Sequence, residues 1–304
     1  MARADRAAGP EPRGVLLIDK PSGLTSFGVV ARVRRALGIK RVGHTGTLDP
    51  LATGLLPICV GAATRLVPFL TDAGKTYRAT VRLGVATDTY DADGQIVQRD
   101  PLEAVAAITA DQVEATLAQF RGVIDQRPPA FSAIQVDGER LYARARRGEA
   151  VEAPVRTVTV HRLEMLSFAS PDLIIEVDCS KGTYIRSLAV DLGAALGLGA
   201  HLSALRRLRV GAFDVDDALS LDALTADVAK AALVTPAAAL AHLPAVQPDE
   251  AVVTDVRVGR RPPLPNVPPG LSRLLDATGR LVAIIDARGA EPLEIVRGFP
   301  PDDP

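Results

Sequence analysis

A polar stretch at residues 42–57 carries the side chains best suited to chemistry. It reads Val-Gly-His-Thr-Gly-Thr-Leu-Asp-Pro-Leu-Ala-Thr-Gly-Leu-Leu-Pro and lies between a basic run and an apolar run. Within six positions, four side chains can donate, accept or ionise: His44, Thr45, Thr47 and Asp49. Three glycines permit a positive φ or a close approach to a ligand: Gly43, Gly46 and Gly54. A rigid scaffold commonly carries its functional groups on such a loop, so we expect a site here.

The same stretch also has a purely structural interpretation. Asp49 followed by Pro50 is a favourable helix start, with the aspartate as N-cap and the proline at the first helical position. His44 could simply bond a loop carbonyl. Short polar motifs often match by chance, so spacing alone leaves both interpretations open.

Several blocks of this chain together resemble one known family. The loop at 43–54 is similar to the signature loop of the TruB family of tRNA pseudouridine synthases. Other blocks resemble that family's motifs and follow in its order: residues 14–23 (Gly-Val-Leu-Leu-Ile-Asp-Lys-Pro-Ser-Gly), 61–65, 75–78, 87–94 and 179–186. Six ordered blocks are far more specific than any one of them.

The resemblance implies that uridine 55 in the T loop of tRNA is isomerised to pseudouridine. The N1–C1′ glycosidic bond breaks, the uracil rotates, and a C5–C1′ bond forms. Neither electrons nor phosphate change hands, so no cofactor and no metal are implied. The target base lies inside a folded loop and must be flipped into a pocket.

Asp49 matches the family's essential aspartate. The sequence leaves open whether it attacks as a nucleophile or removes a sugar proton. Arg186 matches its partner, and we expect its planar fork to hold both carboxylate oxygens and keep Asp49 charged. The other matched positions are Tyr77, expected to stack on the uracil, His44 as a wedge, Tyr184 and Leu205 lining the uracil site, and Lys20 positioning the pocket. Without this context, Tyr77 would be a core aromatic and Lys20 a turn lysine.

The distribution of charge points to RNA although the net charge is only −1. Basic residues cluster at 32–41, 140–147 and 206–209, and each cluster alone is more often a solvated surface. Beside the motifs we interpret them as phosphate contacts. The family's RNA-gripping insertion corresponds to about 121–156, where the expected contacts are Arg140, Arg144, Arg146 and Arg147. Gln135 stands where the family often has lysine, which removes one expected contact.

Two other functions compete with this interpretation. Asp91-x-Asp93 resembles the nucleophile motif of a magnesium-dependent phosphohydrolase, although Gln95 replaces the usual threonine or valine. A non-catalytic RNA-binding protein would use the basic clusters alone and would tolerate Asp49→Asn. Neither uses all six blocks.

Composition predicts a cytoplasmic protein, which we expect to be a monomer with tRNA as its partner. The 304 residues are 47% hydrophobic, and no apolar run reaches the ~18–20 residues that span a bilayer. The segment at 1–12 is polar, lacks a secretory apolar region and is interpreted as a disordered tail. Cys59 and Cys179 are interpreted as buried thiols in a reducing compartment.

The order of helix and strand patterns predicts an α+β fold with a mixed or antiparallel sheet and flanking helices, typical of pseudouridine synthases. Residues 25–37, 110–120 and 184–196 have helical periodicity, and 76–85 and 173–179 alternate as half-buried strands. We expect a catalytic domain at 13–243 and a small β-barrel, similar to the PUA domain, at 244–304. The Pro-rich segment at 262–269 precedes two of the barrel's expected strands.

Overall fold

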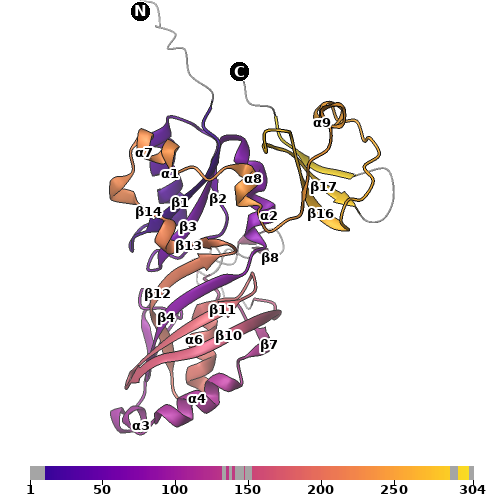
Figure 1. Cartoon of the computed structure of the whole chain (residues 1–304). Helices are drawn as coiled ribbons and strands as arrows, with labels where there is room; N and C mark the ends of the chain where they lie inside the picture. The colour runs from indigo at the N-terminus through magenta and orange to yellow at the C-terminus, as the bar shows by residue number, and fades with distance from the viewer. Residues whose placement is uncertain are drawn as a thin grey trace, which may run out of the picture.

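A mixed sheet of ten strands forms the centre of the protein (Figure 1). The computed structural model describes residues 11–131, 135–136, 139–140, 147, 153–287 and 294–300. Within them the main path of the sheet is β14 (Leu219–Ser220), β1 (Gly14–Lys20), β3 (Thr53–Val60), β12 (Ala200–Val210), β4 (Lys75–Leu83), β11 (Asp172–Cys179), β10 (Arg156–Ala169) and β7 (Gly122–Gln126). Two short strands pair beside this path: β2 (Val42–His44) with β3, and β13 (Phe213–Asp214) with β12. The expected mixed sheet is confirmed.

Strand β4 lies between β12 and β11 and pairs antiparallel with both. Its side chains alternate as the sequence predicted, with Tyr77 and Val81 buried and Arg78 and Arg82 exposed. The strand ends two residues earlier than predicted, at Leu83, because Gly84 turns the chain with φ 81°. A separate hairpin of β5 (Val85–Thr87) and β6 (Ile96–Arg99) follows.

Helices pack along this sheet at both ends of the molecule (Figure 1). Helix α1 (Ser26–Leu37) begins at the N-cap Thr25 and ends at Gly38, whose left-handed conformation terminates it as predicted. Helix α6 (Ile185–Ala195) packs against β12, and α4 (Ala110–Ala118) packs against β10. The other helical segments are α2 (Val67–Thr71), α3 (Leu102–Ala106), α7 (Ala226–Ala231), α8 (Pro236–Ala239), η1 (Gly61–Leu66), η2 (Val215–Asp217) and η3 (Leu221–Ala223).

The C-terminal part contains a separate sheet of four strands. Its order is β15 (Ala245–Val246), β16 (Gly270–Leu275), β17 (Leu281–Ala287) and β18 (Glu294–Gly298), with α9 (Glu250–Arg257) packed on it. In the described residues this sheet is open, so the expected closed PUA-like barrel is not confirmed. The two strands predicted around 277–279 are present.

The two cysteines are buried, one in β3 and one in β11, as expected. Burial raises the pKa of the Cys59 thiol to about 12 and that of Cys179 to about 11. No helix in the described part of the chain is long and apolar enough to cross a membrane. Most of the tail expected at 1–12 lies outside the described residues.

Candidate active site

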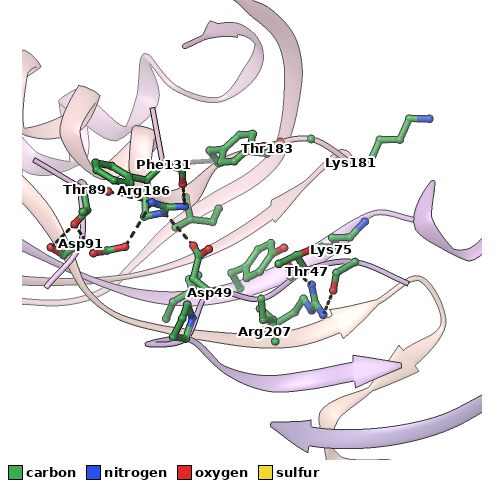
Figure 2. Close-up of a pocket in the computed structure, with 18 of the residues that line it drawn as sticks. Thr47, Asp49, Lys75, Thr89, Asp91, Phe131, Lys181, Thr183, Arg186 and Arg207 are labelled. Carbon is green, nitrogen blue, oxygen red and sulfur yellow. Dashed lines mark hydrogen bonds and ion pairs between the residues drawn. The ribbon is translucent and has the colours of Figure 1, made fainter. Parts of the chain in front are cut away.

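A cavity of about 760 Å³ opens where the signature loop meets the start of α6 (Figure 2). Its walls come from segments far apart in sequence: the loop around Asp49, strand β4 with Tyr77, the turn carrying Thr89 and Asp91, and strand β12 with Leu205. Four of the six motif blocks, at 43–54, 75–78, 87–94 and 179–186, therefore converge on one cavity.

Asp49 lies at this cavity with its carboxylate directed at Arg186 (Figure 2). Asp49 Oδ2 is 3.0 Å from Arg186 Nε. No helix begins at Asp49; the chain bends through Pro50 and enters β3 at Thr53, so the N-cap interpretation is wrong. Arg186 is buried in the first turn of α6, which is where its pairing with Asp49 was predicted.

The guanidinium of Arg186 serves more than one carboxylate. Nη1 donates to Thr89 O at 3.1 Å and lies 3.5 Å from Asp91 Oδ2. Nη2, which a two-point fork on Asp49 would need beside Nε, donates instead to Phe131 O at 3.0 Å. Arg186 thus joins the signature loop to two other loops and does not close the expected fork on Asp49 alone.

Asp91 lies in the block at 87–94, but its sequence context indicated a specific role only in the rival motif. It is buried, and its Oδ1 accepts bonds from Thr89 Oγ1 at 2.6 Å and from the backbone N–H of Asp93 at 3.2 Å. Its other oxygen faces Arg186. The described residues contain no group of three side chains placed to hold a metal, and Asp91 is bound as the partner of an arginine.

The pKa of Asp49 is raised above its ordinary value, chiefly because the surrounding protein removes water from the carboxylate. Arg186 opposes this shift, and the like charge of Asp91 adds to it. The side chain keeps 33% of its surface exposed towards the cavity, so a substrate can reach it. Arg186 favours the charged form of Asp49, as expected, but burial raises the pKa of Asp49 by more than Arg186 lowers it.

Tyr77, Tyr184 and Leu205 line the cavity, as predicted. Burial raises the pKa of the Tyr77 phenol, which stays protonated at neutral pH. Tyr184 is the N-cap residue of α6, and Gln126 fixes its backbone from both sides: Oε1 accepts from Tyr184 N at 2.7 Å and Nε2 donates to Tyr184 O at 3.0 Å.

His44 and Lys20 lie beside the cavity and not among its lining residues. His44 Nδ1 accepts a bond from the N–H of Gly46 at 3.3 Å, and burial, with Arg207 adding to it, lowers its pKa. Lys20 is fully buried, and its Nζ donates to the carbonyls of Pro21, Leu24 and Pro50 at 3.0, 2.7 and 3.2 Å. Burial lowers the pKa of Lys20 to about 8, with the charge of Asp49 opposing.

The basic cluster at 206–209 is not a set of free phosphate contacts. Arg206 pairs with Asp19 at 2.8 Å and Arg209 with Asp214 at 2.7 Å, while Arg207 is buried behind the signature loop. The alternation of β12 could have revealed that Arg207 points inward. In the cluster at 140–147, Arg147 is exposed, Arg140 belongs to the short strand β9 (Glu139–Arg140), which pairs with β8 (Gln135–Val136), and Arg144 and Arg146 lie outside the described residues.

Proteins in two solved complexes share this fold. The chain matches a protein in a Cbf5–Nop10–Gar1 complex with a TM-score of 0.74 at 28% identity, covering 99% of this chain and 92% of that one. It matches an H/ACA RNP bound to a substrate RNA containing 2′-deoxyuridine with a TM-score of 0.73 at 28% identity, covering 95% and 85%. The fold is that of a pseudouridine synthase.

Sequence comparison identifies the family. The model of the TruB family pseudouridylate synthase N-terminal domain matches residues 34–185, and that of the tRNA pseudouridylate synthase B C-terminal domain matches 186–253. The tRNA pseudouridine synthase B of Azoarcus sp. is 47% identical over 89% of this chain and 90% of its own length, and that of Symbiobacterium thermophilum is 50% identical over 81% and 82%. The chain therefore belongs to the TruB family of tRNA pseudouridine synthases. Neither rival function is supported.

Proposed function

We propose that this tRNA pseudouridine synthase acts on uridine 55 in the T loop, with Asp49 as its catalytic residue. One observation carries the proposal: a carboxylate held by Arg186 at 3.0 Å lies at a cavity of about 760 Å³. That volume falls within the range of pockets for small-molecule ligands, so a flipped nucleoside fits. The family resemblance supplies the position in tRNA.

The reaction conserves the atoms of the nucleotide except for one exchangeable proton. The N1–C1′ bond breaks, the uracil turns, C5 bonds to C1′, the hydrogen on C5 leaves as a proton, and N1 takes up a proton. Asp49 begins this sequence as an anion, either by attacking C1′ or by removing a proton from the sugar. Arg186 keeps the carboxylate oriented towards the cavity and lowers its pKa against the effect of burial.

The base is held by the cavity's apolar walls. Tyr77 stacks on the uracil, while Leu205 and Tyr184 close the pocket around it. His44 is partly exposed at the end of β2, where it wedges into the space left by the flipped base. Lys20 holds the signature loop through the bond from its Nζ to Pro50 O.

The T arm is gripped through its phosphates. We assign this contact to the insertion at about 121–156, with Arg140, Arg144, Arg146 and Arg147, and to exposed basic residues beside the signature loop, such as Arg41. We further propose a catalytic domain at 13–243, a C-terminal domain at 244–304 that helps hold tRNA, and a cytoplasmic enzyme that works as a monomer.

Release of tritium from RNA labelled at C5 of uridine tests this function. A T-loop stem-loop should release tritium with the wild type, and Asp49→Asn should abolish release while tRNA binding stays near wild type. A stem-loop with uridine at 55 replaced by cytidine is the matched control for position. Turnover within tenfold of wild type in Asp49→Asn would refute the role of Asp49, and release from the control RNA would refute the assignment of uridine 55.

A further inference from the structure

Arg207 differs from its basic neighbours on β12. The side chains of Arg206 and Arg209 keep 39% and 64% of their surface exposed, whereas Arg207 is 1% exposed. With Lys20 it is one of the largest fully buried side chains in the described part of the protein. A long cation in the interior of a domain is rare and calls for compensating interactions.

All three nitrogens of this guanidinium contact backbone carbonyls, two in the signature loop and one directly after it in β3. Nη2 donates to Gly46 O at 3.2 Å and Nη1 to Thr47 O at 3.4 Å (Figure 2). Nε donates to Leu55 O at 2.7 Å. Two of these carbonyls precede Asp49 and one follows it. Arg207 therefore joins the incoming and outgoing limbs of the loop that presents the carboxylate.

Other side chains that bond the backbone of this loop each hold it at one position. Residues 45–52 form no helix or strand, so no regular backbone ladder fixes Asp49. Ser26 bonds Leu48, Lys20 bonds Pro50 and Ser22 bonds Leu51, and backbone bonds run from Gly23 N to Pro50 O and from Thr45 N to Pro57 O. Among these four side chains, only Arg207 contacts residues on both sides of Asp49.

The charge of Arg207 has no carboxylate partner among the described residues, so its burial is offset by the carbonyl bonds and by a side-chain hydrogen bond with the Tyr77 phenol. The backbone around it is equally constrained. A Cβ at Gly54 would lie 2.3 Å from Arg207 O, so β3 and β12 approach here at a distance that only glycine permits. On the other side of β12, Arg207 pairs in register with Tyr77.

We propose that Arg207 is a positioning residue for catalysis: it sets the place of Asp49 by holding both limbs of the signature loop. The proposal rests on Asp49 being the catalytic carboxylate. Lysine keeps the charge but has one nitrogen in place of three, so it cannot occupy the three positions from which the guanidinium nitrogens reach Leu55, Gly46 and Thr47. A small displacement of a reacting group is enough to slow the chemical step.

The test compares Arg207→Lys and Arg207→Met with Arg206→Lys and Arg206→Met. Each is assayed for single-turnover rate constant with saturating enzyme, for Kd on a T-loop stem-loop, and for the binding-competent fraction by stoichiometric titration. We expect the rate constant to fall at least about tenfold in Arg207→Lys and further in Arg207→Met. Kd should change less than about threefold because Arg207 is buried behind the loop, and the Arg206 variants should match wild type.

The three readouts separate positioning from a merely structural role. Misfolding lowers the binding-competent fraction but leaves the rate constant of the remaining enzyme intact, whereas misplacement of Asp49 lowers the rate constant itself. A normal rate constant in Arg207→Lys overturns the proposal. This holds even if the binding-competent fraction or the affinity for RNA has fallen. If Arg207→Met does not fold, Arg207→Lys decides alone.

Asp49→Asn in the same assay keeps this inference distinct from the proposed function. If Asp49→Asn turns over normally, the assignment of the catalytic residue has failed. If Asp49→Asn is inactive while Arg207→Lys is normal, only the positioning role is lost.

Discussion

Arg186 bonds to three loops at once, so the effect of replacing it on the reaction rate can be predicted. Lysine could keep one contact, with Asp49 or Asp91, but not the bonds to Thr89 O and Phe131 O as well. Arg186→Lys should therefore lower the single-turnover rate by about a hundredfold or more with little change in Kd for a T-loop stem-loop. A normal rate with weakened binding would instead identify Arg186 as a phosphate contact.

Asp91 affects the ionisation of Asp49 as well as the position of Arg186. Asp49 must be deprotonated to act, and its pKa is raised by burial and by the like charge of Asp91. The acid limb of kcat/KM should therefore have its midpoint above the ordinary aspartate value of about 3.9. In Asp91→Asn that midpoint should move to lower pH, even though the plateau rate falls.

The pH profile of Asp93→Asn is the matched control, because Asp93 also lines the cavity but is not a cause of the shift at Asp49. An unchanged midpoint in Asp91→Asn, or one that moves equally in both variants, would contradict the coupling between Asp49 and Asp91.

The raised pKa of Asp49 also predicts a stability cost. A carboxyl with a higher pKa in the folded than in the unfolded state binds more protons when folded, so its ionisation destabilises the protein as pH rises through the folded pKa. Asp49→Asn should consequently have a Tm at pH 7 equal to or above wild type, with the gap closing as pH falls towards the ordinary carboxyl range.

Asp172→Asn provides the opposite case for the same measurement. A side-chain hydrogen bond from Arg82 lowers the pKa of Asp172, so its charge stabilises the fold above the ordinary carboxyl pKa. Asp172→Asn should lose Tm at pH 7. If Asp49→Asn loses as much as Asp172→Asn, the contact with Arg186 outweighs the burial of Asp49.

Residue types alone predicted where chemistry could occur, but they did not predict every contact that the catalytic groups make. Asp49 and Tyr77 could be assigned because they belong to recognisable blocks, and Leu205 because it matches a pocket position of the family. The contact between Asp91 and Arg186 joins residues nearly a hundred positions apart and depends on how two loops meet. Arg207 was missed because a run of arginines looks like a surface cluster unless strand alternation is applied to it.

At the scale of elements, the crossing of β3 and β12 is the tightest point behind the site. Gly54 has φ +97°, and an added Cβ would lie 2.3 Å from Arg207 O. Gly54→Ala should lower the free energy of unfolding by roughly 2–5 kcal/mol, combining backbone strain with overpacking. Urea denaturation of the two proteins measures this loss.

Gly122→Ala isolates the contribution of backbone strain in the same measurement. Gly122 has a similar φ of +90°, but a Cβ there would meet no atom within 4 Å. Gly122→Ala should therefore lower the free energy of unfolding by only about 1–2 kcal/mol. Equal losses in the two variants would mean that β3 and β12 can separate without cost.

Periodic elements could be predicted well because burial of one face dictates them. Helix α1 begins and ends at its capping residues Thr25 and Gly38, and β4 alternates as expected. The pair Asp49-Pro50 fits the pattern of a helix start, but no helix follows it, because a capping pattern depends only on neighbouring residues and not on what the rest of the fold requires. The apolar residues that follow are completely buried in β3, which pairs with β1, β2 and β12.

For the whole molecule, the C-terminal sheet is not independent of the rest. Leu281, Ile284 and Phe299 share a hydrophobic cluster with Val15 and Leu55 of the central sheet. Arg65 Nη1 also donates to Gly298 O at 2.7 Å across this contact. Alternation predicted individual strands here, but it cannot determine whether a sheet closes, because closure depends on strands pairing at both edges.

The charge distribution predicts salt-dependent binding by a protein whose net charge is only −1. Each phosphate contact releases counterions, so log K for tRNA should fall by about 0.7–0.9 per contact for each decade of salt. Replacing Arg144, Arg146 and Arg147 together with alanine should flatten that slope by up to about 2–3.

The double replacement of Arg206 and Arg209 with alanine is the control, because Asp19 and Asp214 already neutralise them and the slope should stay as in wild type. The measurement is a series of binding titrations between low and high salt. A slope unchanged by the triple replacement would exclude the 140–147 cluster from the RNA interface, and a slope flattened equally by the double one would mean that those two ion pairs open when tRNA binds.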